Sequence, residues 1–210
     1  KQQVSMTDVA IDMPAGPSEV AIVADKTCHP EYVAADMLSQ AEHGMDSQSI
    51  LFTDNEDVAR AVLAEVEKQL EALPRKEMAS SSLGHSRIVV LHDMEEAFEI
   101  CNQYAPEHLI LAMDTALDWA DRVVNAGSVF LGHYSCESAG DYASGTNHTL
   151  PTSGYAKAYS GVNLDSFCRK ITFQHLTREG IESIGRAVEV MAEAESLDAH
   201  RNAMTLRMKN

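Results

Sequence analysis

The sequence predicts an α/β protein with a mostly parallel β-sheet and helices on both of its faces. Short apolar runs that end in turn-forming residues alternate with longer runs whose apolar residues recur at helical spacing. A helix between two successive strands carries the chain back along the sheet, so the strands on either side of it lie parallel. After the fifth strand the alternation stops, which predicts a small helical appendage instead of more sheet.

Each element follows from a local signal. Pro30 suits a first helical turn and Gly44 a helix end, Asp54 can cap the second helix, and Pro74 stops it. The predicted strands are residues 19–25, 49–52, 87–91, 108–112 and 128–131. The predicted helices between them are residues 30–44, 57–73, 94–104 and 115–125.

The pattern breaks at residues 132–164, which are rich in Gly, Ser, Thr, Asn and Tyr. Loops longer than roughly 12–15 residues are uncommon in compact domains and are often functional. Beyond this loop we expect a strand at 171–176, a helix starting at Thr177 and a second helix near 197–208. The predicted domains are therefore an α/β domain, 1–164, with an active-site loop at 132–164, and a helical arm, 165–210, that docks on a partner subunit.

Composition narrows the function classes. The 210 residues carry a formal net charge of -16, which repels phosphate backbones and anionic lipid, so neither nucleic acid nor a membrane is an expected partner. No apolar run approaches the roughly 20 residues of a membrane helix. The four cysteines form no CxxC pair, which favours free thiols in a reducing cytoplasm over a thiolate zinc site. Since the chain starts with neither Met nor a signal-like apolar stretch, we expect it to begin partway through a longer one.

Gln40 and His43 form the first candidate pair. They lie three residues apart in a predicted helix, so they share a face, and imidazole is a common zinc ligand. The alternative is structural, since a histidine in a last helical turn also interacts well with the helix dipole. On spacing alone the structural role is the more common one. Their position just before a strand also conflicts with the rule that open α/β sheets bind ligands at the carboxyl ends of strands.

Glu107 and His108 provide an adjacent carboxylate and imidazole at the start of a strand, which suits acid–base chemistry. Neighbouring strand residues point to opposite faces, however, and on this fragment alone that favours only one of them in a site. Asp141 and His148 lie in the Gly-rich loop, where backbone can approach a ligand closely, although Asp and Asn beside Gly are also ordinary turn residues.

Ser18, Glu195 and His200 carry weaker signals. Ser18 can be a turn residue or cap before the first strand, and the other two suit a charged, solvated helix end. Neither a GxGxxG nor a GxxxxGK[ST] motif occurs, so the usual nucleotide fingerprints are missing. The residues alone therefore indicate a cytoplasmic α/β protein with a candidate Gln/His/Asp metal site, and they do not define a reaction.

Several long segments, in order, resemble the histidinol dehydrogenase family. The resemblance runs from about Ala10 to Met208, and ESAGDYASGTNHTLPT is far more specific than any short motif. The segments are AIDMPAGPSEV, LSQAEHG, SRIVVL, NQYAPEHLIL, NAGSVFLG, ESAGDYASGTNHTLPTSGY and LDAHRNAMTLRM.

The resemblance implies a fold with incomplete Rossmann-like domains in an intertwined homodimer, of which this chain supplies the second such domain and the C-terminal arm. The family's NAD docks mainly on the domain that this chain lacks, so no cofactor-binding residue is assigned here. One Zn²⁺ is implied per site. Its ligands would be Gln40, His43, Asp141 and His200.

The implied activity is the NAD-dependent oxidation of L-histidinol through histidinal to L-histidine. Glu107 and His108 would be the catalytic pair, with His108 as the base on the alcohol and Glu107 activating the water that attacks the aldehyde. The substrate-binding residues would be Ser18, Gln40, His43, Glu107, His108, Asp141, His148, Glu195 and His200. Because the arm residues would reach the partner's site, the active site would be shared between subunits. The alternative is a non-catalytic α/β module that binds zinc or a small ligand.

Overall fold

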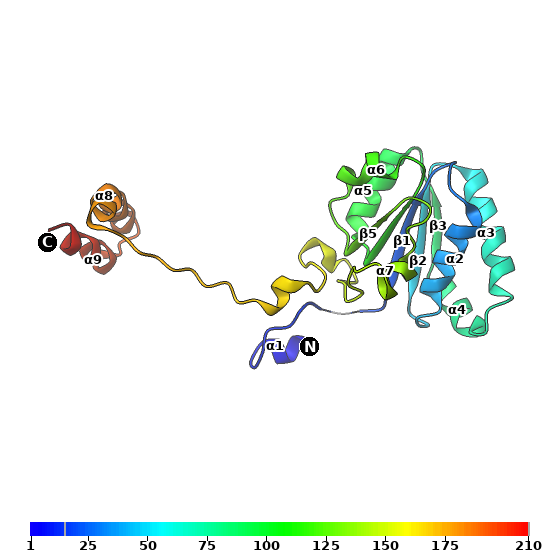
Figure 1. The fold of residues 1–210 in the computed structure, drawn as a ribbon, viewed down its shortest axis with the longest axis horizontal. Helices are drawn as coiled ribbons and strands as arrows, with labels where there is room; N and C mark the ends of the chain where they lie inside the picture. The colour runs from blue at the N-terminus through cyan, green and yellow to red at the C-terminus, as the bar shows by residue number, and fades with distance from the viewer. Residues whose placement is uncertain (15, 210) are drawn as a thin grey trace. The chain divides into compact units, whose positions relative to one another are not determined.

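The computed structural model describes residues 1–14 and 16–209 in two units, Lys1–Phe167 and Cys168–Asn210. The first unit contains the sheet and the second contains a helix pair (Figure 1). No described helix is both long enough and apolar enough to cross a membrane.

The first unit is built on a parallel five-stranded sheet with the strand order β3-β2-β1-β4-β5. This arrangement confirms the predicted α/β class. The chain builds β2 and β3 on one side of β1 and then returns to place β4 and β5 on the other side. The strands are β1 (Glu19–Ala24), β2 (Gln48–Thr53), β3 (Arg87–Val90), β4 (His108–Ala112) and β5 (Ser128–Leu131).

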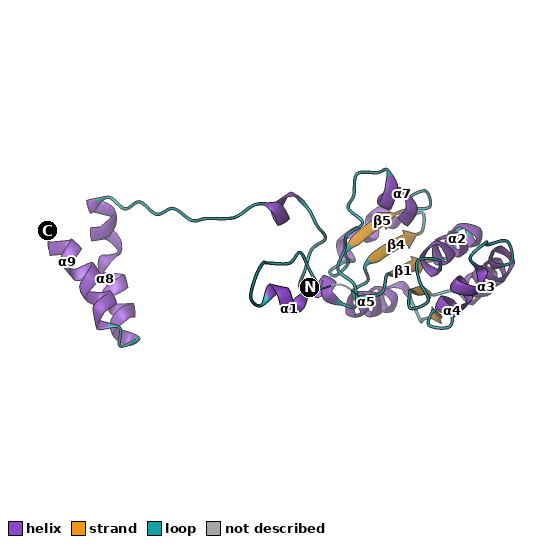
Figure 2. Cartoon of the chain, turned by 90° about the horizontal axis from the view of Figure 1, so that it is seen from below, coloured by secondary structure: helices purple, strands orange, loops and turns teal. Residues whose placement is uncertain are grey.

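Helices cover both faces of this sheet (Figure 2). Alternate residues of β1 enter two separate cores: Val20 and Ile22 pack toward α2 and α3, whereas Ala21 and Val23 pack toward α5 and α6. A strand buried on both faces reads as a continuous apolar run, as the first strand does. The helices are α2 (Pro30–Ala41), α3 (Glu56–Leu70), α4 (Lys76–Leu83), α5 (Met94–Tyr104) and α6 (Ala116–Trp119), besides a short α1 (Gln2–Ser5).

Several local expectations for the helices that follow β2 and β4 were wrong. Asn55, not Asp54, caps α3, because its side-chain oxygen accepts hydrogen bonds from the backbone N–H groups of Asp57 and Val58. The helix ends at Leu70 instead of Leu73, and α4 follows it unpredicted. The helix predicted at 115–125 is shorter, with α6 followed by a 3₁₀ turn, η1 (Ala120–Arg122).

The long loop is partly helical. It contains α7 (Glu137–Tyr142) and the 3₁₀ turns η2 (Tyr155–Lys157) and η3 (Leu164–Phe167). The strand expected at 171–176 does not form, and these residues are exposed, without a strand partner among the described residues.

The second unit consists of α8 (Arg178–Ala194) and α9 (Asp198–Lys209). Thr177 caps α8 by accepting a hydrogen bond from the Gly180 N–H at 3.2 Å. A Cβ at Gly185 would lie 2.1 Å from the Met208 sulfur, so the two helices pack closely where this glycine sits. A pocket of about 510 Å³ within this unit is lined in part by His200.

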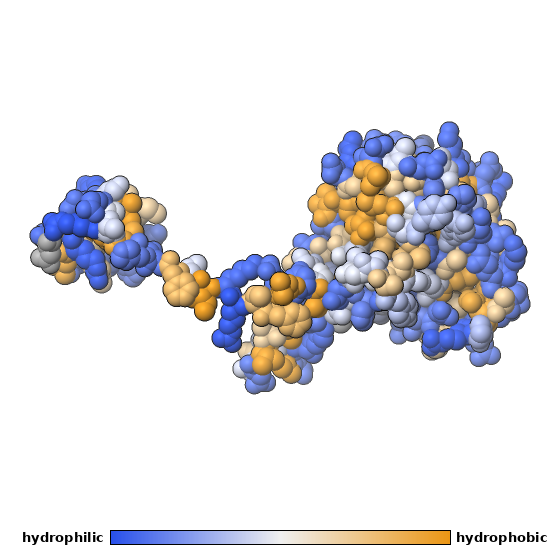
Figure 3. All heavy atoms as spheres, viewed as in Figure 1, coloured by the Kyte–Doolittle hydropathy of each residue, from blue (hydrophilic) through white to orange (hydrophobic). Residues whose placement is uncertain are grey.

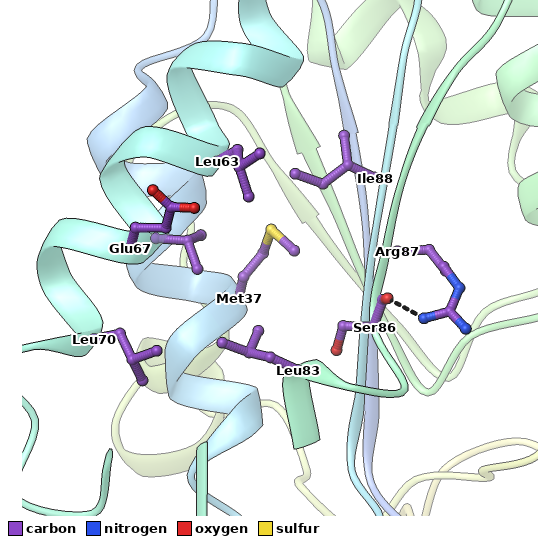
Figure 4. Close-up of a pocket in the computed structure, with 9 residues that line it drawn as sticks. Met37, Leu63, Glu67, Leu70, Leu83, Ser86, Arg87 and Ile88 are labelled. Atoms are coloured by element: carbon purple, nitrogen blue, oxygen red, sulfur yellow. Dashed lines mark hydrogen bonds between the residues drawn. The ribbon is translucent and has the colours of Figure 1, made fainter. Parts of the chain in front are cut away.

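Two apolar features of the first unit lie on its helical faces. Figure 3 shows an apolar patch near α6 and β5, where Leu117, Val124 and Val129 are exposed. Figure 4 shows a second feature, a pocket of about 330 Å³ where side chains of α2, α3 and β3 converge. Met37, Leu70 and Ile88 are among its apolar lining residues, and this composition indicates packing space more than a catalytic site.

Candidate active site

The candidate site lies at the amino edge of the sheet, where β1 and β4 begin side by side. Glu19 is the first residue of β1 and His108 the first of β4, with Glu107 immediately before it. Gln40 and His43 were expected in one helix, but α2 ends at Ala41. His43 therefore lies in the turn between α2 and β2. The helix boundaries are close to the predicted ones. The conflict with the carboxyl-end rule is therefore real: this site is at the opposite edge.

The backbone around Glu107 is tightly constrained. Ala105, at φ +57°, ends α5 in the left-handed region, and Pro106 then restricts the chain before the strand. Gly127 passes directly over this segment, since a Cβ there would lie 2.5 Å from the Glu107 carbonyl oxygen. Its N–H donates to the Pro106 carbonyl at 2.9 Å. Only a glycine fits this close approach, so the backbone at Gly127 packs directly against the backbone of Glu107.

The Glu107 carboxylate is buried and held by two donors. The Ser18 hydroxyl donates to its Oε2 at 2.6 Å, and the Glu19 N–H donates to the same oxygen at 2.9 Å. The His108 Nδ1 lies 3.6 Å from that oxygen. The alternation argument against having both residues in one site was wrong, because Glu107 precedes the strand and its side chain turns along the sheet edge.

His108 is also buried, and its two ring nitrogens differ. Nδ1 lies 3.3 Å from the Glu19 carbonyl oxygen. Nε2 lies 3.6 Å from the Asp141 Oδ1 and has no hydrogen-bond partner among the described residues. A neutral imidazole with one nitrogen anchored and the other free is the arrangement that a general base requires.

Glu137 is a site residue that the sequence reasoning missed. It is 1% exposed, and its Oε1 lies 3.8 Å from the His43 Nε2 and 4.0 Å from the His108 Nδ1. It precedes Asp141 by four residues in α7, so the two carboxylates share one helix face. That spacing was the available signal.

Unsatisfied polar atoms gather at this edge. In the described part of the chain, the buried side-chain N and O atoms without a hydrogen-bond partner are both amide atoms of Gln40, His108 Nε2 and Glu137 Oε2. Buried polar atoms are nearly always paired, so a cluster of exceptions indicates a missing ligand. Ligand atoms of His43, Glu137 and Asp141 also lie within 4.8 Å of one another. This nitrogen and oxygen donor set fits a zinc ion, and the buried, unpaired amide of Gln40 is a further candidate donor.

Burial without a countercharge perturbs the titration of the cluster. Desolvation, opposed by the bonds from Ser18 and Glu19, raises the pKa of Glu107 to about 7. Desolvation, with the nearby carboxylates of Asp141 and Glu107, raises the pKa of Glu137 to about 9. Desolvation lowers the pKa of His108, which favours its neutral form. Each direction follows mainly from burial, which disfavours the charged form of each group.

The remaining predicted site residues lie farther from this cluster in the chain. His148 is exposed in the loop after α7. Glu195 ends α8 and His200 lies in the first turn of α9, both exposed in the second unit. A pocket of about 460 Å³, lined in part by Ser18 and His43, opens at the amino edge.

Comparison with known proteins identifies the family. The histidinol dehydrogenase family model matches residues 1–208. The chain belongs to the histidinol dehydrogenase family.

Individual relatives agree. The histidinol dehydrogenase of Bacteroides thetaiotaomicron is 61% identical over 99% of this chain and 49% of its own length. The chloroplastic histidinol dehydrogenase of Oryza sativa is 58% identical over 96% of this chain and 43% of its own. The crystal structure of histidinol dehydrogenase from Elizabethkingia anophelis matches with a TM-score of 0.96 and 59% identity over 100% of this chain and 48% of that one. The chain thus spans about half the length of the histidinol dehydrogenases it matches.

Proposed function

We propose that this chain provides the substrate- and zinc-binding half of a histidinol dehydrogenase, which oxidises L-histidinol through histidinal to L-histidine with NAD as the hydride acceptor. The observation that carries the proposal is the buried pair of Glu107 and His108, 3.6 Å apart, together with a metal-ligand cluster of His43, Glu137 and Asp141. A family relationship covering residues 1–208 supports it.

Zinc is the implied metal, and Gln40, His43 and Asp141 would hold it here, with His200 contributed by the arm. Zinc would supply a positive charge that binds the amine and imidazole nitrogens of the substrate. The cluster's raised carboxylate pKa values indicate that a cation would be accommodated at this edge. Glu137 lies close enough to His43 to support it, in the manner of the carboxylates that orient metal-bound histidines.

In the first oxidation, the His108 Nε2 would accept the proton of the substrate hydroxyl as the carbinol carbon gives up a hydride, for which NAD⁺ would be the acceptor. The bond to hydrogen breaks with its electron pair, and the C=O bond of the aldehyde forms. The lowered pKa of His108 keeps its imidazole neutral and able to accept this proton near pH 7.

In the second oxidation, Glu107 accepts a proton from the water that attacks the aldehyde, and the resulting hydrate loses a second hydride. Both described hydrogen bonds to this carboxylate end on Oε2, so Oε1 is the oxygen available to water. A carboxyl whose pKa is about 7 can act as a base near neutral pH. The two steps together consume one water and reduce two NAD molecules.

The first test is the thermal stability of the 210-residue chain without metal, with zinc, and with zinc plus histidinol. A ligand that binds only the folded state stabilises it by about 2.7 kcal/mol at 100 times its dissociation constant. We expect zinc to raise Tm and histidinol to raise it further, whereas histidinol without zinc should have little effect. A Tm unchanged by zinc would count against a metal site on this half.

We further propose a homodimer in which His200 of the partner's arm completes each site, as membership of the histidinol dehydrogenase family implies. Mixing His43→Ala and His200→Ala chains, each joined to the remaining half of the enzyme, should restore activity that neither homodimer has. Failure of every mixture to recover activity would contradict site sharing.

A second candidate is a non-catalytic module that binds zinc or a small ligand, since the chain spans about half of its relatives. It predicts zinc and histidinol binding without NADH formation even when the remaining half is supplied.

The proposed location is the cytoplasm, although the rice relative is named as chloroplastic. The net charge of -16 argues against nucleic acid as a partner.

A further inference from the structure

Glu19 is a buried carboxylate that no step of the proposed reaction uses. It is 7% exposed at the first position of β1, the central strand of the sheet. Burial is the largest influence on its carboxyl and raises its pKa. A carboxylate in such a position is costly unless several donors hold it, so its partners indicate what it is for.

Those partners come from two different segments, the long loop and α5. Its Oε1 accepts a hydrogen bond from the Ser153 N–H at 3.0 Å, and its Oε2 lies 3.2 Å from the Tyr104 hydroxyl at the end of α5. The Tyr104 hydroxyl donates at 2.7 Å to the Gln48 Oε1 of β2. Glu19 therefore joins the sheet edge and α5 to the long loop through its two carboxylate oxygens.

The backbone of Glu19 holds the catalytic pair at the same time. Its N–H donates to the Glu107 Oε2, and its carbonyl oxygen lies 3.3 Å from the His108 Nδ1. The side chain of Glu19 thus fastens the loop to the very residue whose backbone orients Glu107 and His108.

The loop at this point has a conformation that needs outside support. Ser153 has φ +55°, in the left-handed region that non-glycine residues seldom occupy, and Gly154 follows at φ +76°. These two residues are the centre of a tight turn, which the Tyr155 N–H closes by donating to the Thr152 carbonyl at 3.0 Å. The Glu19 carboxylate accepts the Ser153 N–H of this turn, and the Gly154 amide also stabilises its charged form. Next to it, the Gly16 N–H donates to the Thr152 Oγ1 at 2.6 Å.

The loop is consequently fixed at two places. Glu137 and Asp141 of α7 lie in the candidate ligand cluster with His43. Residues 152–154 are fastened to Glu19 and Gly16. His148 lies on the exposed stretch between them. Leu150, Pro151 and Thr152 are buried between His148 and Ser153, so the tether to Glu19 acts on residues 152–154 and not on His148.

We propose that Glu19 is a positioning residue that fastens the loop at residues 152–154 to the amino edge of the sheet, beside the backbone that orients Glu107 and His108. Its importance for catalysis rests on the proposed function, but the tether itself does not. The reach of the side chain to Ser153 is what matters, more than its charge.

The test compares hydrogen exchange in wild type, Glu19→Asp and Glu19→Gln forms of the 210-residue chain without metal or substrate. The shorter aspartate keeps the charge but cannot reach Ser153, whereas the glutamine keeps the reach and an oxygen acceptor. We expect the amides of residues 153–155 to exchange at least tenfold faster in Glu19→Asp. In Glu19→Gln we expect them to stay within about threefold of wild type.

Tyr104→Phe is the matched control, because it removes the contact to Oε2 and leaves the bond from Ser153 to Oε1. It should leave exchange at residues 153–155 unchanged, and the β4 amides of Leu109–Leu111 should stay protected in all variants. Wild-type protection in Glu19→Asp, or equal loss of protection in the loop and in β4, would overturn the proposal. Since neither zinc nor histidinol is present, failure here is distinct from failure of the proposed function.

Discussion

The two edges of the same sheet differ in how their polar groups are satisfied. At the carboxyl edge, Thr27 donates to Asp25 and accepts from the Asp114 N–H, while His133 contacts the Asp114 carboxylate at 3.0 Å. These groups are partly or fully exposed, and they pair with one another. At the amino edge, Gln40, His108 and Glu137 are buried with unpaired atoms.

This difference is the reason for proposing a site at the amino edge, against the usual rule for open α/β sheets. The rule places ligands at the carboxyl ends of strands, where the strand order reverses, and β1 and β4 form such a point. In this chain that edge is closed by its own hydrogen bonds. Unsatisfied buried polar atoms are therefore a better guide to the site than sheet topology, because their desolvation has a free-energy cost that only a ligand can offset.

The largest expected effect is on zinc binding at the amino edge. His43→Ala removes the one imidazole of the cluster formed with Glu137 and Asp141, and we expect zinc affinity to fall by about 100-fold or more. Competition with a chromophoric chelator measures this. His29→Ala is the matched control, since His29 contacts the ring of His133 near the carboxyl edge. Equal losses in the two variants would remove the distinction between the edges.

A second effect concerns stability without metal. Glu137 has a folded pKa of about 9 against an ordinary 4.5, so its contribution to the stability of the metal-free fold is greatest below pH 4.5 and declines as pH rises toward 9. Glu137→Gln should therefore stabilise the metal-free chain at pH 8, by at least about 1 kcal/mol, with little gain near pH 4.5. Zinc affinity should fall in the same variant.

The single tryptophan makes this measurement specific to the sheet-bearing unit. Trp119 stacks on Phe98 at a ring distance of 4.9 Å, so its fluorescence reports unfolding of that unit in urea. Glu99→Gln, at an exposed position of α5, is the control and should change nothing. A Glu137→Gln variant less stable than wild type at pH 8 would contradict this prediction. It would show that the Glu137 carboxyl group stabilises the metal-free fold.

Much of the fold could be predicted because local signals and burial agree. β4 and β5 and helix α5 have the predicted bounds, since their apolar residues recur at the spacing of the element they form. Residues 171–176 show the opposite case. Their alternation resembles a strand, but a strand needs a partner, and the sequence does not show whether one is available.

The sequence predicted the members of the candidate site whose residue type and neighbours are typical of a catalytic or metal site. Glu107 and His108 were both named from the sequence. Their side chains lie close together only because β4 begins at His108 and not at Glu107, and sequence patterns do not fix a strand boundary to one residue. Glu137 and Glu19 were missed because a glutamate in a polar loop or at a strand start is usually solvated. Their burial results from α7 and residues 152–154 folding onto the sheet edge, which are long-range contacts that local patterns do not reveal.

A smaller effect should appear in thiol reactivity. Cys136 precedes α7 beside Glu137 and is partly exposed, whereas Cys28 lies past the carboxyl end of β1, where burial raises its pKa to about 11. In a Cys168→Ser background we expect zinc to slow alkylation of Cys136 by a few-fold, because the ion fixes α7. Cys28 should stay unreactive with or without zinc. Mass spectrometry of the alkylated peptides measures both, and zinc protection of neither thiol would imply that α7 does not respond to the ion.

The smallest effect is expected for the polar pair at the carboxyl edge. Asp114 is 69% exposed and His133 is 13% exposed, and a pair with one solvated partner contributes only about 0–1 kcal/mol. Asp114→Asn should therefore change the stability of the sheet-bearing unit by less than about 0.5 kcal/mol, and it should leave zinc affinity and the histidinol-dependent rise in Tm as in wild type. Urea unfolding followed by Trp119 fluorescence, together with the zinc titration, measures these quantities. A marked loss of zinc or histidinol binding in this variant would mean that the carboxyl edge also contributes to the site, because an exposed pair that only closes a loop has no route to a ligand at the opposite end of the strands.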